Sequence, residues 1–299
     1  MLRARSIAFD EAPRQLDLFD LGLLPTLETV VNQKLDRLLK DTLAASREAY
    51  RERYGENPNY HELYRLVFRL LAAKVFADRT GESGWSSDNP RDVLAAIERY
   101  YFPEGVPEPV LGDTATQTVA WERIRSSFHL QNISVEALAY VYEHTLVSEE
   151  TRKTYGTYST PPAVAEYLVQ HLPFEQLPEN ERYVFEPFAG GAALLIAALG
   201  RLRALLPSDM APAHRHAYLQ RMLGGMELDA FAHEVAWLSL VQADFPNHNG
   251  WRLLEGDVFA DPRANAELSR ARVVLCNPPF QDFSSEELAT YPGVRSTNK

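Results

Sequence analysis

The sequence predicts an α/β fold in which an all-α domain precedes a parallel sheet covered by helices. Up to about residue 150, apolar residues recur with the period of helices and show no strand-like alternation. Beyond it, short apolar runs that end in polar residues alternate with helical stretches, a pattern typical of parallel sheets. A length of 299 residues suits about two domains. We therefore expect an arm over 1–25, a helical domain over 26–150 and an α/β domain over 151–299.

The composition is that of an ordinary globular protein. Hydrophobic residues make up 45% of the chain and charged residues 24%, which excludes a disordered or fibrous class. The one cysteine, Cys276, excludes an intrachain disulfide and a site built from several thiolates, and it fits a reducing cytosol. The start of the chain lacks a signal-peptide-like apolar segment, and the longest uncharged apolar run, 188–200, is too short to span a bilayer. We expect a cytoplasmic protein that binds no membrane.

The charge balance is acidic, with 41 Asp and Glu against 30 Lys and Arg and a net charge of −11. Domains that grip nucleic acid by its backbone usually present a basic surface. Taken alone, the balance argues against unaided binding of DNA or RNA.

Helical periodicity runs through the first half of the chain. Before one of these helices, Asn89 is a good cap and Pro90 a good first helical residue. The predicted helices lie at 26–54, at 60–78, from 90 onward, at 117–128 and at 134–146.

The second half alternates strands and helices. The strand-like runs are 183–188, 224–229, 251–257 and 272–280, and the helical stretches are 192–206, 211–223, 230–243 and 262–269. In open parallel sheets the ligand binds beyond the carboxyl ends of the strands. Polar residues at those ends, which we expect to face one crevice, are Glu186, Glu227, Asp257 and Asn277.

His214 and His216 form the only histidine pair that suggests a metal ligand. They lie in a polar helical stretch with no carboxylate or thiol at ligand spacing. We interpret this stretch as a solvated helix face and expect no metal site.

The residues Asn277-Pro278-Pro279-Phe280 end the last strand-like run, after its strand over 272–276. Two prolines cannot continue a hydrogen-bonded ladder, so the chain leaves the sheet rigidly there. The Asn277 amide then faces the crevice, and Phe280 presents a flat apolar ring. Asparagine matches the hydrogen-bonding edge of adenine, and an aromatic ring stacks on an extruded base. A capped strand exit with a packed phenylalanine is an equally good interpretation of these four residues alone.

A glycine-rich turn, Glu186-Pro187-Phe188-Ala189-Gly190-Gly191, joins a strand-like run to a helix. Paired glycines let backbone approach a ligand closely, although a buried helix after a glycine turn has the same pattern. Glu227 ends the next strand, where acids of nucleotide-binding folds hold ribose hydroxyls, and Asp257 has the matching position on the third strand. Acids at successive strand ends favour a nucleotide-type ligand.

The most specific pattern lies over 134–169. It consists of a helix, a charged stretch and the turn Gly156-Thr157-Tyr158-Ser159-Thr160-Pro161-Pro162, all ahead of the glycine loop. With its motifs in this order, the sequence resembles the adenine-N6 DNA methyltransferases with N-terminal helical domains. The resemblance runs from about residue 60 to 290. That family includes modification subunits of type I restriction systems and single-chain restriction–modification and phage-defence enzymes. One departure is Ala192, where the family's loop commonly has a second glycine; Gly191 can compensate.

The resemblance implies a Rossmann-like sheet that binds S-adenosylmethionine. Thr160 and Pro161 are expected near the methionine carboxylate, which fits a good N-cap and a good first helical residue at a helix N-terminus. Glu227 is expected to hold the ribose hydroxyls and Asp257 the adenine, which Phe188 or Leu228 flanks. The implied cofactor-binding residues are Thr160, Pro161, Glu186, Pro187, Ala189, Gly190, Glu227 and Asp257.

The resemblance also implies the reaction, with Asn277, Pro278, Pro279 and Phe280 as the catalytic residues and double-stranded DNA as the substrate. The exocyclic amine of adenine is a poor nucleophile because its lone pair is delocalised into the ring. The side-chain oxygen of Asn277 and the carbonyl of Pro278 are expected to accept its two N–H bonds, and Phe280 to stack on the flipped base. The sulfonium makes the cofactor's methyl group electrophilic, so the protein mainly positions two reactants.

A methyltransferase sheet of this family has seven strands, whereas the sequence shows four. We therefore expect the chain to be a fragment, or one half of a split enzyme completed by another chain, because a sheet that stops here exposes an apolar edge. The basic DNA-recognition surface is then expected outside this sequence. Two alternatives stay open: methylation of RNA or of a protein glutamine, which use similar strand exits, and a scaffold whose degenerate glycine loop no longer binds cofactor.

Overall fold

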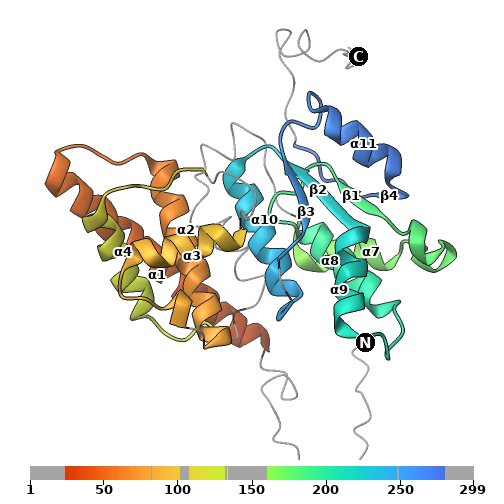
Figure 1. Cartoon of the computed structure of the whole chain (residues 1–299), viewed down its shortest axis with the longest axis horizontal. Helices are drawn as coiled ribbons and strands as arrows, with labels where there is room; N and C mark the ends of the chain where they lie inside the picture. Colours follow the sequence, from red (N-terminus) through yellow and green to blue (C-terminus); the bar gives the residue numbers. More distant parts are fainter. Residues whose placement is uncertain are drawn as a thin grey trace, which may run out of the picture.

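The computed structural model of the chain describes residues 24–81, 83–101, 108–131, 133, 160–247 and 249–279. Within these residues, helices precede a four-stranded parallel sheet that is covered by further helices (Figure 1), which confirms the predicted α/β fold class. Most of the predicted arm over 1–25, the predicted helix over 134–146 and Phe280 lie outside the described residues.

The helical part consists of α1 (Leu24–Tyr54), α2 (Tyr60–Thr80), η1 (Ser83–Trp85), α3 (Pro90–Tyr101) and α4 (Thr114–Arg125). Local signals set the helix ends. The Asn59 side chain accepts hydrogen bonds from the first amides of α2, and Gly81 ends this helix in the left-handed conformation. Asp113 caps α4 through the amide of Thr116, so α4 starts earlier than the predicted 117–128. α2 is buried over most of its length, and α1, α3 and α4 pack around it.

The α/β part begins with α7 (Pro162–Gln170), η3 (Phe174–Gln176) and η4 (Glu179–Glu181). It continues with β1 (Val184–Glu186), α8 (Ala193–Ala204), α9 (Pro212–Met222), β2 (Leu223–Glu227), α10 (Ala230–Ala243), β3 (Arg252–Glu255), α11 (Pro262–Arg270) and β4 (Val273–Val274). All four strands are parallel, in the order β3-β2-β1-β4. β4 is shorter than the predicted strand over 272–276, although the N–H of Leu275 still donates to the carbonyl of Phe185 in β1 at 3.1 Å.

Helices cover the faces of the sheet and leave its carboxyl edge to the loops. α8 packs on β1 and β2, α10 packs on β2 and β3, and α7 lies beside α8. The connection from β3 to β4 runs back across the sheet, and a right-handed crossover then puts α11 on the other face, apart from α8 and α10 in Figure 1. The strand order therefore reverses between β1 and β4, where open α/β sheets form their ligand crevice.

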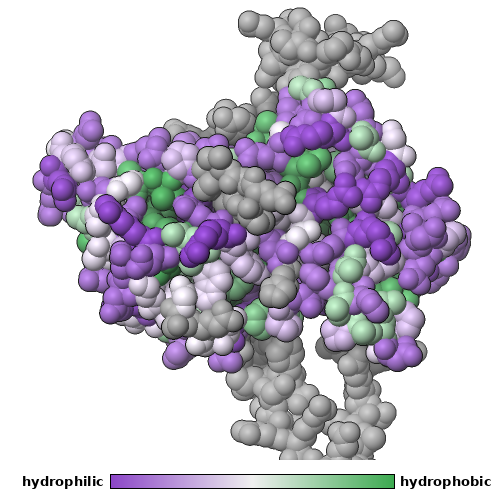
Figure 2. All heavy atoms as spheres, in the orientation of Figure 1, coloured by the Kyte–Doolittle hydropathy of each residue, from purple (hydrophilic) through white to green (hydrophobic). Residues whose placement is uncertain are grey.

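The buried core continues from the helical part into the α/β part, inside a polar surface. Phe68 of α2 meets Phe231 of α10 edge-on, with 5.3 Å between ring centroids. The face seen in Figure 2 is mostly hydrophilic, and its hydrophobic areas are small and separated. Within the described ranges, no helix combines the length and the apolar content needed to cross a membrane.

Tyr183, immediately before β1, fastens the amino end of the sheet to α11. Its hydroxyl donates to Glu267 at 2.5 Å, and the guanidinium of Arg270 lies over its ring, 4.1 Å from the centroid. Burial, and then the bond to Glu267, raises the pKa of this hydroxyl, so it remains a donor at physiological pH. A Cβ atom on Gly224 of β2 would lie 2.1 Å from the same hydroxyl. The ring is held from two sides, so β2 requires a glycine there.

We predict that Gly224→Ala destabilises the protein by about 1–3 kcal/mol, because the added methyl group overpacks a site where the tyrosine cannot move aside. Urea unfolding measures the loss. The matched control is Gly200→Ala on α8, where an added Cβ meets nothing within 4 Å. The control is expected to be neutral or to stabilise by up to about 1 kcal/mol. Equal effects of the two substitutions would contradict this explanation.

Candidate functional site

Four polar residues lie at the carboxyl edge of the sheet. Glu186 and Glu227 are the last residues of β1 and β2. Asp257 follows the end of β3 by two residues, and Asn277 follows the end of β4 by three. Because the strands are parallel, these ends share one edge. Glu186 and Asn277 flank the point where the strand order reverses.

Glu186 is a buried carboxyl with an unsatisfied oxygen. The residue is 3% exposed, and its Oε2 atom has no hydrogen-bond partner. Burial raises the pKa of Glu186 well above its usual range; the backbone N–H of Leu195 acts against this rise, and the charge of Glu227 adds to it. A buried acceptor without a donor is costly, so this oxygen is suited to a donor supplied by a ligand.

The glycine loop after β1 is bound to the end of β2. The backbone N–H of Ala189 donates to the carbonyl of Met226 at 2.9 Å, and that of Gly190 donates to Oε2 of Glu227 at 2.7 Å. Gly190 takes a left-handed conformation with φ +49°. The loop therefore brings the ends of the first two strands into direct contact.

Ala192 departs from the ordinary backbone conformation of an alanine. It is left-handed, with φ +67°, and Gly191 is not, so Gly191 does not take over the conformation of the missing glycine. A left-handed alanine costs about 1–2 kcal/mol, and such strain is concentrated at functional loops. Ala192 is also the N-cap of α8, and its own side chain makes no capping hydrogen bond. The amide of Leu195 in the first turn of α8 bonds to the Glu186 carboxyl instead, so the glycine loop and the start of α8 are organised around Glu186.

Glu227 is held in one orientation by backbone amides. Besides Gly190 on Oε2, the N–H of Asp229 donates to Oε1 at 3.0 Å. Burial raises the pKa of Glu227, and the N–H groups of Asp229 and Gly190 act in the opposite direction. A carboxylate oxygen can accept more than one hydrogen bond. The two amides therefore orient the Glu227 side chain and leave it able to accept from a hydroxyl.

An aromatic pair stands beside Asp257. The N–H of Phe259 donates to Oδ1 of Asp257 at 2.9 Å, and its ring centroid is 5.9 Å from that of Phe188. Phe259 is 45% exposed, and Leu228, after β2, is 64% exposed. Phe188 and Leu228 were expected here from the sequence, whereas Phe259 was not. The available signal was an aromatic residue two positions after a strand-end acid.

Thr160 and Asn277 meet although they are 117 residues apart. The Nδ2 atom of Asn277 donates to Oγ1 of Thr160 at 3.1 Å. The prediction that Thr160 caps the following helix is wrong by one residue, because Pro161 occupies the cap position of α7 and Pro162 is its first residue. Either proline suits a helix start, and the Thr160 hydroxyl is used on Asn277 instead. Pro278 and Pro279 are exposed.

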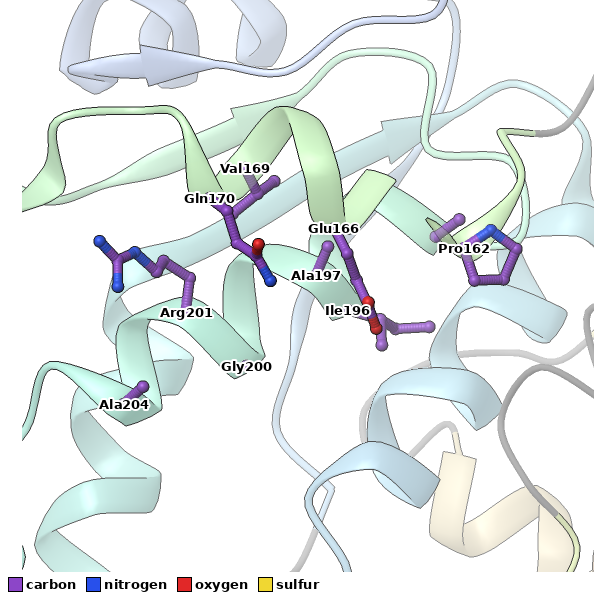
Figure 3. Close-up of a pocket in the computed structure, with 10 residues that line it drawn as sticks. Pro162, Glu166, Val169, Gln170, Ile196, Ala197, Gly200, Arg201 and Ala204 are labelled. Carbon is purple, nitrogen blue, oxygen red and sulfur yellow. The ribbon is translucent and has the colours of Figure 1, made fainter. Parts of the chain in front are cut away.

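A groove of about 560 Å³ lies between α7 and α8. In Figure 3, Glu166 and Gln170 extend from α7 toward α8. The groove is lined by Pro162, Glu166, Val169, Gln170, Ala193, Ile196, Ala197, Gly200, Arg201 and Ala204. It reaches the first residues of both helices, but Glu186, Glu227, Asp257 and Asn277 are not among its lining residues.

The interpretation of 214–216 as a solvated face is wrong for His216. Its Nδ1 lies 2.5 Å from Oδ2 of the buried Asp244, and its ring packs edge-on against Trp251. Arg203 donates to the other oxygen of Asp244 at 2.7 Å. The helical pattern could not reveal a partner 28 residues away. Among the residues that the structure describes, no three His, Cys, Asp or Glu side chains are grouped to hold a metal ion.

Comparison with known proteins agrees with this geometry. The profile of the family described as N-6 DNA Methylase matches residues 134–295, more than half of the chain. No curated protein matches the sequence.

The solved structures that share the fold include the following three. A protein from Vibrio vulnificus YJ016, assigned as a modification subunit of a type I restriction enzyme, has 17% identity and a TM-score of 0.53 over 86% of this chain and 64% of its own. The type IIL restriction-modification enzyme MmeI, in complex with DNA, has 16% identity and a TM-score of 0.50, over 83% and 43%. A DrdV–DNA complex has 14% identity and a TM-score of 0.51, over 93% and 31%. The chain thus spans less than two thirds of each of these structures.

The raised pKa of Glu186 predicts a pH-dependent effect of Glu186→Gln. Below about pH 4.5 the carboxyl is protonated in both the folded and the unfolded chain, so ionisation does not distinguish variant from wild type. As the pH rises, the unfolded glutamate ionises and the buried one resists, which destabilises the folded wild type. The difference in the free energy of unfolding, variant minus wild type, should therefore increase as the pH rises, by at most about 1.4 kcal/mol per pH unit. Urea titrations from pH 4.5 to 8 test this, and a constant difference would contradict it.

Proposed function

Because the chain belongs to the N-6 DNA methylase family, we propose that it is the catalytic part of an adenine-N6 DNA methyltransferase of a restriction–modification or phage-defence system. The observation that carries the proposal is the hydrogen bond between Asn277 and Thr160. It joins the residue expected to bind the target amine to the turn expected to bind the cofactor. Glu186 lies at the neighbouring strand end, so both reactants have a place at one edge of the sheet.

The residues present fit S-adenosylmethionine. The unsatisfied Oε2 of Glu186 suits the cofactor's ammonium group, and the start of α7, at Thr160 and Pro161, is proposed to lie near its carboxylate. Glu227, oriented by two backbone amides, suits the ribose hydroxyls. Asp257 suits the adenine, flanked by Phe188 and Phe259. The remaining residues proposed to line the methionine end are Pro187, Ala189 and Gly190. When bound, the cofactor supplies an electrophilic methyl group on a sulfonium.

Asn277 is proposed to act on the target amine. The hydrogen bond from Nδ2 of Asn277 to Thr160 fixes the orientation of the side-chain amide. It therefore also fixes the direction in which Oδ1 can accept an N–H of adenine. The carbonyl of Pro278 accepts the second N–H. These two bonds localise the nitrogen lone pair for attack. Pro279 keeps the strand exit rigid, and Phe280, outside the described residues, is proposed to stack on the flipped base.

Further polypeptide is proposed to complete the sheet, from a longer chain or from a partner subunit. Val274 of the edge strand β4 is 49% exposed, and α7 exposes Val164, Tyr167 and Leu168. Among the described strands β4 has a neighbour on one side only, and such an edge is suited to pairing with a further strand. The 299 residues have a net charge of −11. A basic DNA-recognition surface in the further polypeptide would account for DNA binding in spite of this acidic charge. The proposed division is an arm over 1–25, a helical domain over 26–150 and a methyltransferase domain over 151–299.

The proposed function is tested first by calorimetric titration of the chain with S-adenosylmethionine. Binding is expected for wild type and, within about twofold, for Asn277→Ala, because Asn277 contacts the target rather than the cofactor. No heat of binding to wild type would favour a scaffold with a degenerate glycine loop.

Methyl transfer is then measured with radiolabelled cofactor, on the chain together with the polypeptide that completes it. Wild type should label double-stranded DNA and release N6-methyladenine on digestion. Asn277→Ala should lose about 100-fold or more in transfer, since it removes an acceptor that acts on the reacting group. Retained turnover of this variant would contradict the assigned role, and labelling of RNA or of protein glutamine in place of DNA would reassign the substrate.

A further inference from the structure

A fully buried ion pair joins the helical part to α10. Arg69 of α2 is 0% exposed, and its Nε and Nη2 atoms donate to Oε2 and Oε1 of Glu234 at 3.0 and 2.5 Å. Its Nη1 atom donates to Glu98 of α3 at 2.9 Å. Arg69 and Glu234 are 165 residues apart in the sequence, so this pair ties two parts of the fold together.

A buried ion pair adds little to the stability of the fold, but it fixes how the two helices are oriented relative to each other. Removing two charges from water costs about as much as their attraction returns, and apolar side chains of similar volume often do as well. The bidentate contact, in contrast, forms both of its hydrogen bonds in only one relative position of guanidinium and carboxylate. The neighbouring contact between Phe68 and Phe231 is apolar and less directional than the ion pair, and α10 also packs on α8, β2 and β3. Arg69 therefore fixes the rotation and the position of α10 against α2.

The start of α10 is continuous with the end of β2. Asp229 caps the helix by accepting from the N–H of Ala232 at 2.7 Å, and the N–H of Asp229 itself donates to Glu227 at 3.0 Å. One turn further along, Nε2 of His233 lies 3.2 Å from the carbonyl of Leu253 in β3. α10 is thus held by the sheet on one side and by Arg69 on the other.

We propose that Arg69 is a positioning residue of the cofactor site. By fixing α10 through Glu234, it fixes the cap at Asp229 and so the carboxylate of Glu227. What Glu227 binds rests on the proposed function, whereas the positioning does not. Coupling between two sites is reciprocal, so a cofactor held by Glu227 in turn strengthens the contact between α2 and α10.

The test removes the two buried charges together; Glu98, the other partner of Arg69, has a side chain that is 30% exposed and so keeps contact with water. Arg69→Met alone leaves a buried, unpaired Glu234 and invites unfolding, so the main variant is Arg69→Met/Glu234→Met. The matched control is Arg272→Met/Glu181→Met, an exposed ion pair elsewhere in the α/β part. If the main variant does not fold, Arg69→Lys replaces it, since lysine keeps the charge and loses the bidentate contact.

Two measurements are made on each variant. Hydrogen exchange without ligand should be faster at the amides of Asp229 and Ala232 in the Arg69 variants, with no matching change in the other strands. Titration with S-adenosylmethionine should give a dissociation constant about tenfold higher, and the control pair should match wild type in both measurements. Unchanged exchange at the start of α10, or equally faster exchange throughout the protein, overturns the inference. If wild type binds no S-adenosylmethionine, the proposed function fails, and the exchange measurement still decides the positioning role.

Discussion

The pairing of β1 with strands on both sides is the constraint on which the rest of the structure depends. β1 is parallel to β2 and to β4, so three loops leave the sheet at the same edge. This arrangement brings the glycine loop, Glu227 and the Asn277 exit together. It also explains why so short a strand is buried at all three of its residues. Without the reversal of strand order at β1, the two predicted motifs would lie at different places in the fold.

The features that cost stability are concentrated around this edge. Glu186 is buried with an unsatisfied oxygen, and Ala192 has a left-handed backbone. Behind the edge, Arg69 and Glu234 are removed from water to make one directional contact. Proteins retain strained or desolvated groups where position matters more than stability. The rest of the described fold, with capped helices and a continuous apolar core, supplies the stability that these groups lower.

Most of the fold was predictable because its elements are marked by local signals. The capping side chains of Asn59 and Asp229, and the prolines at several helix starts, act within one turn of the chain. The predicted 230–243 is the α10 that the structure contains. The predictions were wrong at the ends of helices and strands whose contacts lie far away in the sequence. β4 is shorter than the predicted strand over 272–276, and α7 starts one residue later than predicted, while the Thr160 hydroxyl accepts from Asn277.

The sequence by itself determined which residues stand at the strand ends, because hydrophobic period and turn residues act over a few positions. It also determined the family, through the order of its motifs. Tertiary structure alone decided which of those residues meet. The bond between Thr160 and Asn277, and that between His216 and Asp244, join atoms that no local pattern relates. The pairing of Arg69 with Glu234 is the extreme case. The physical reason is that such contacts depend on the order of the strands and on the packing of the helices, which local sequence patterns do not specify.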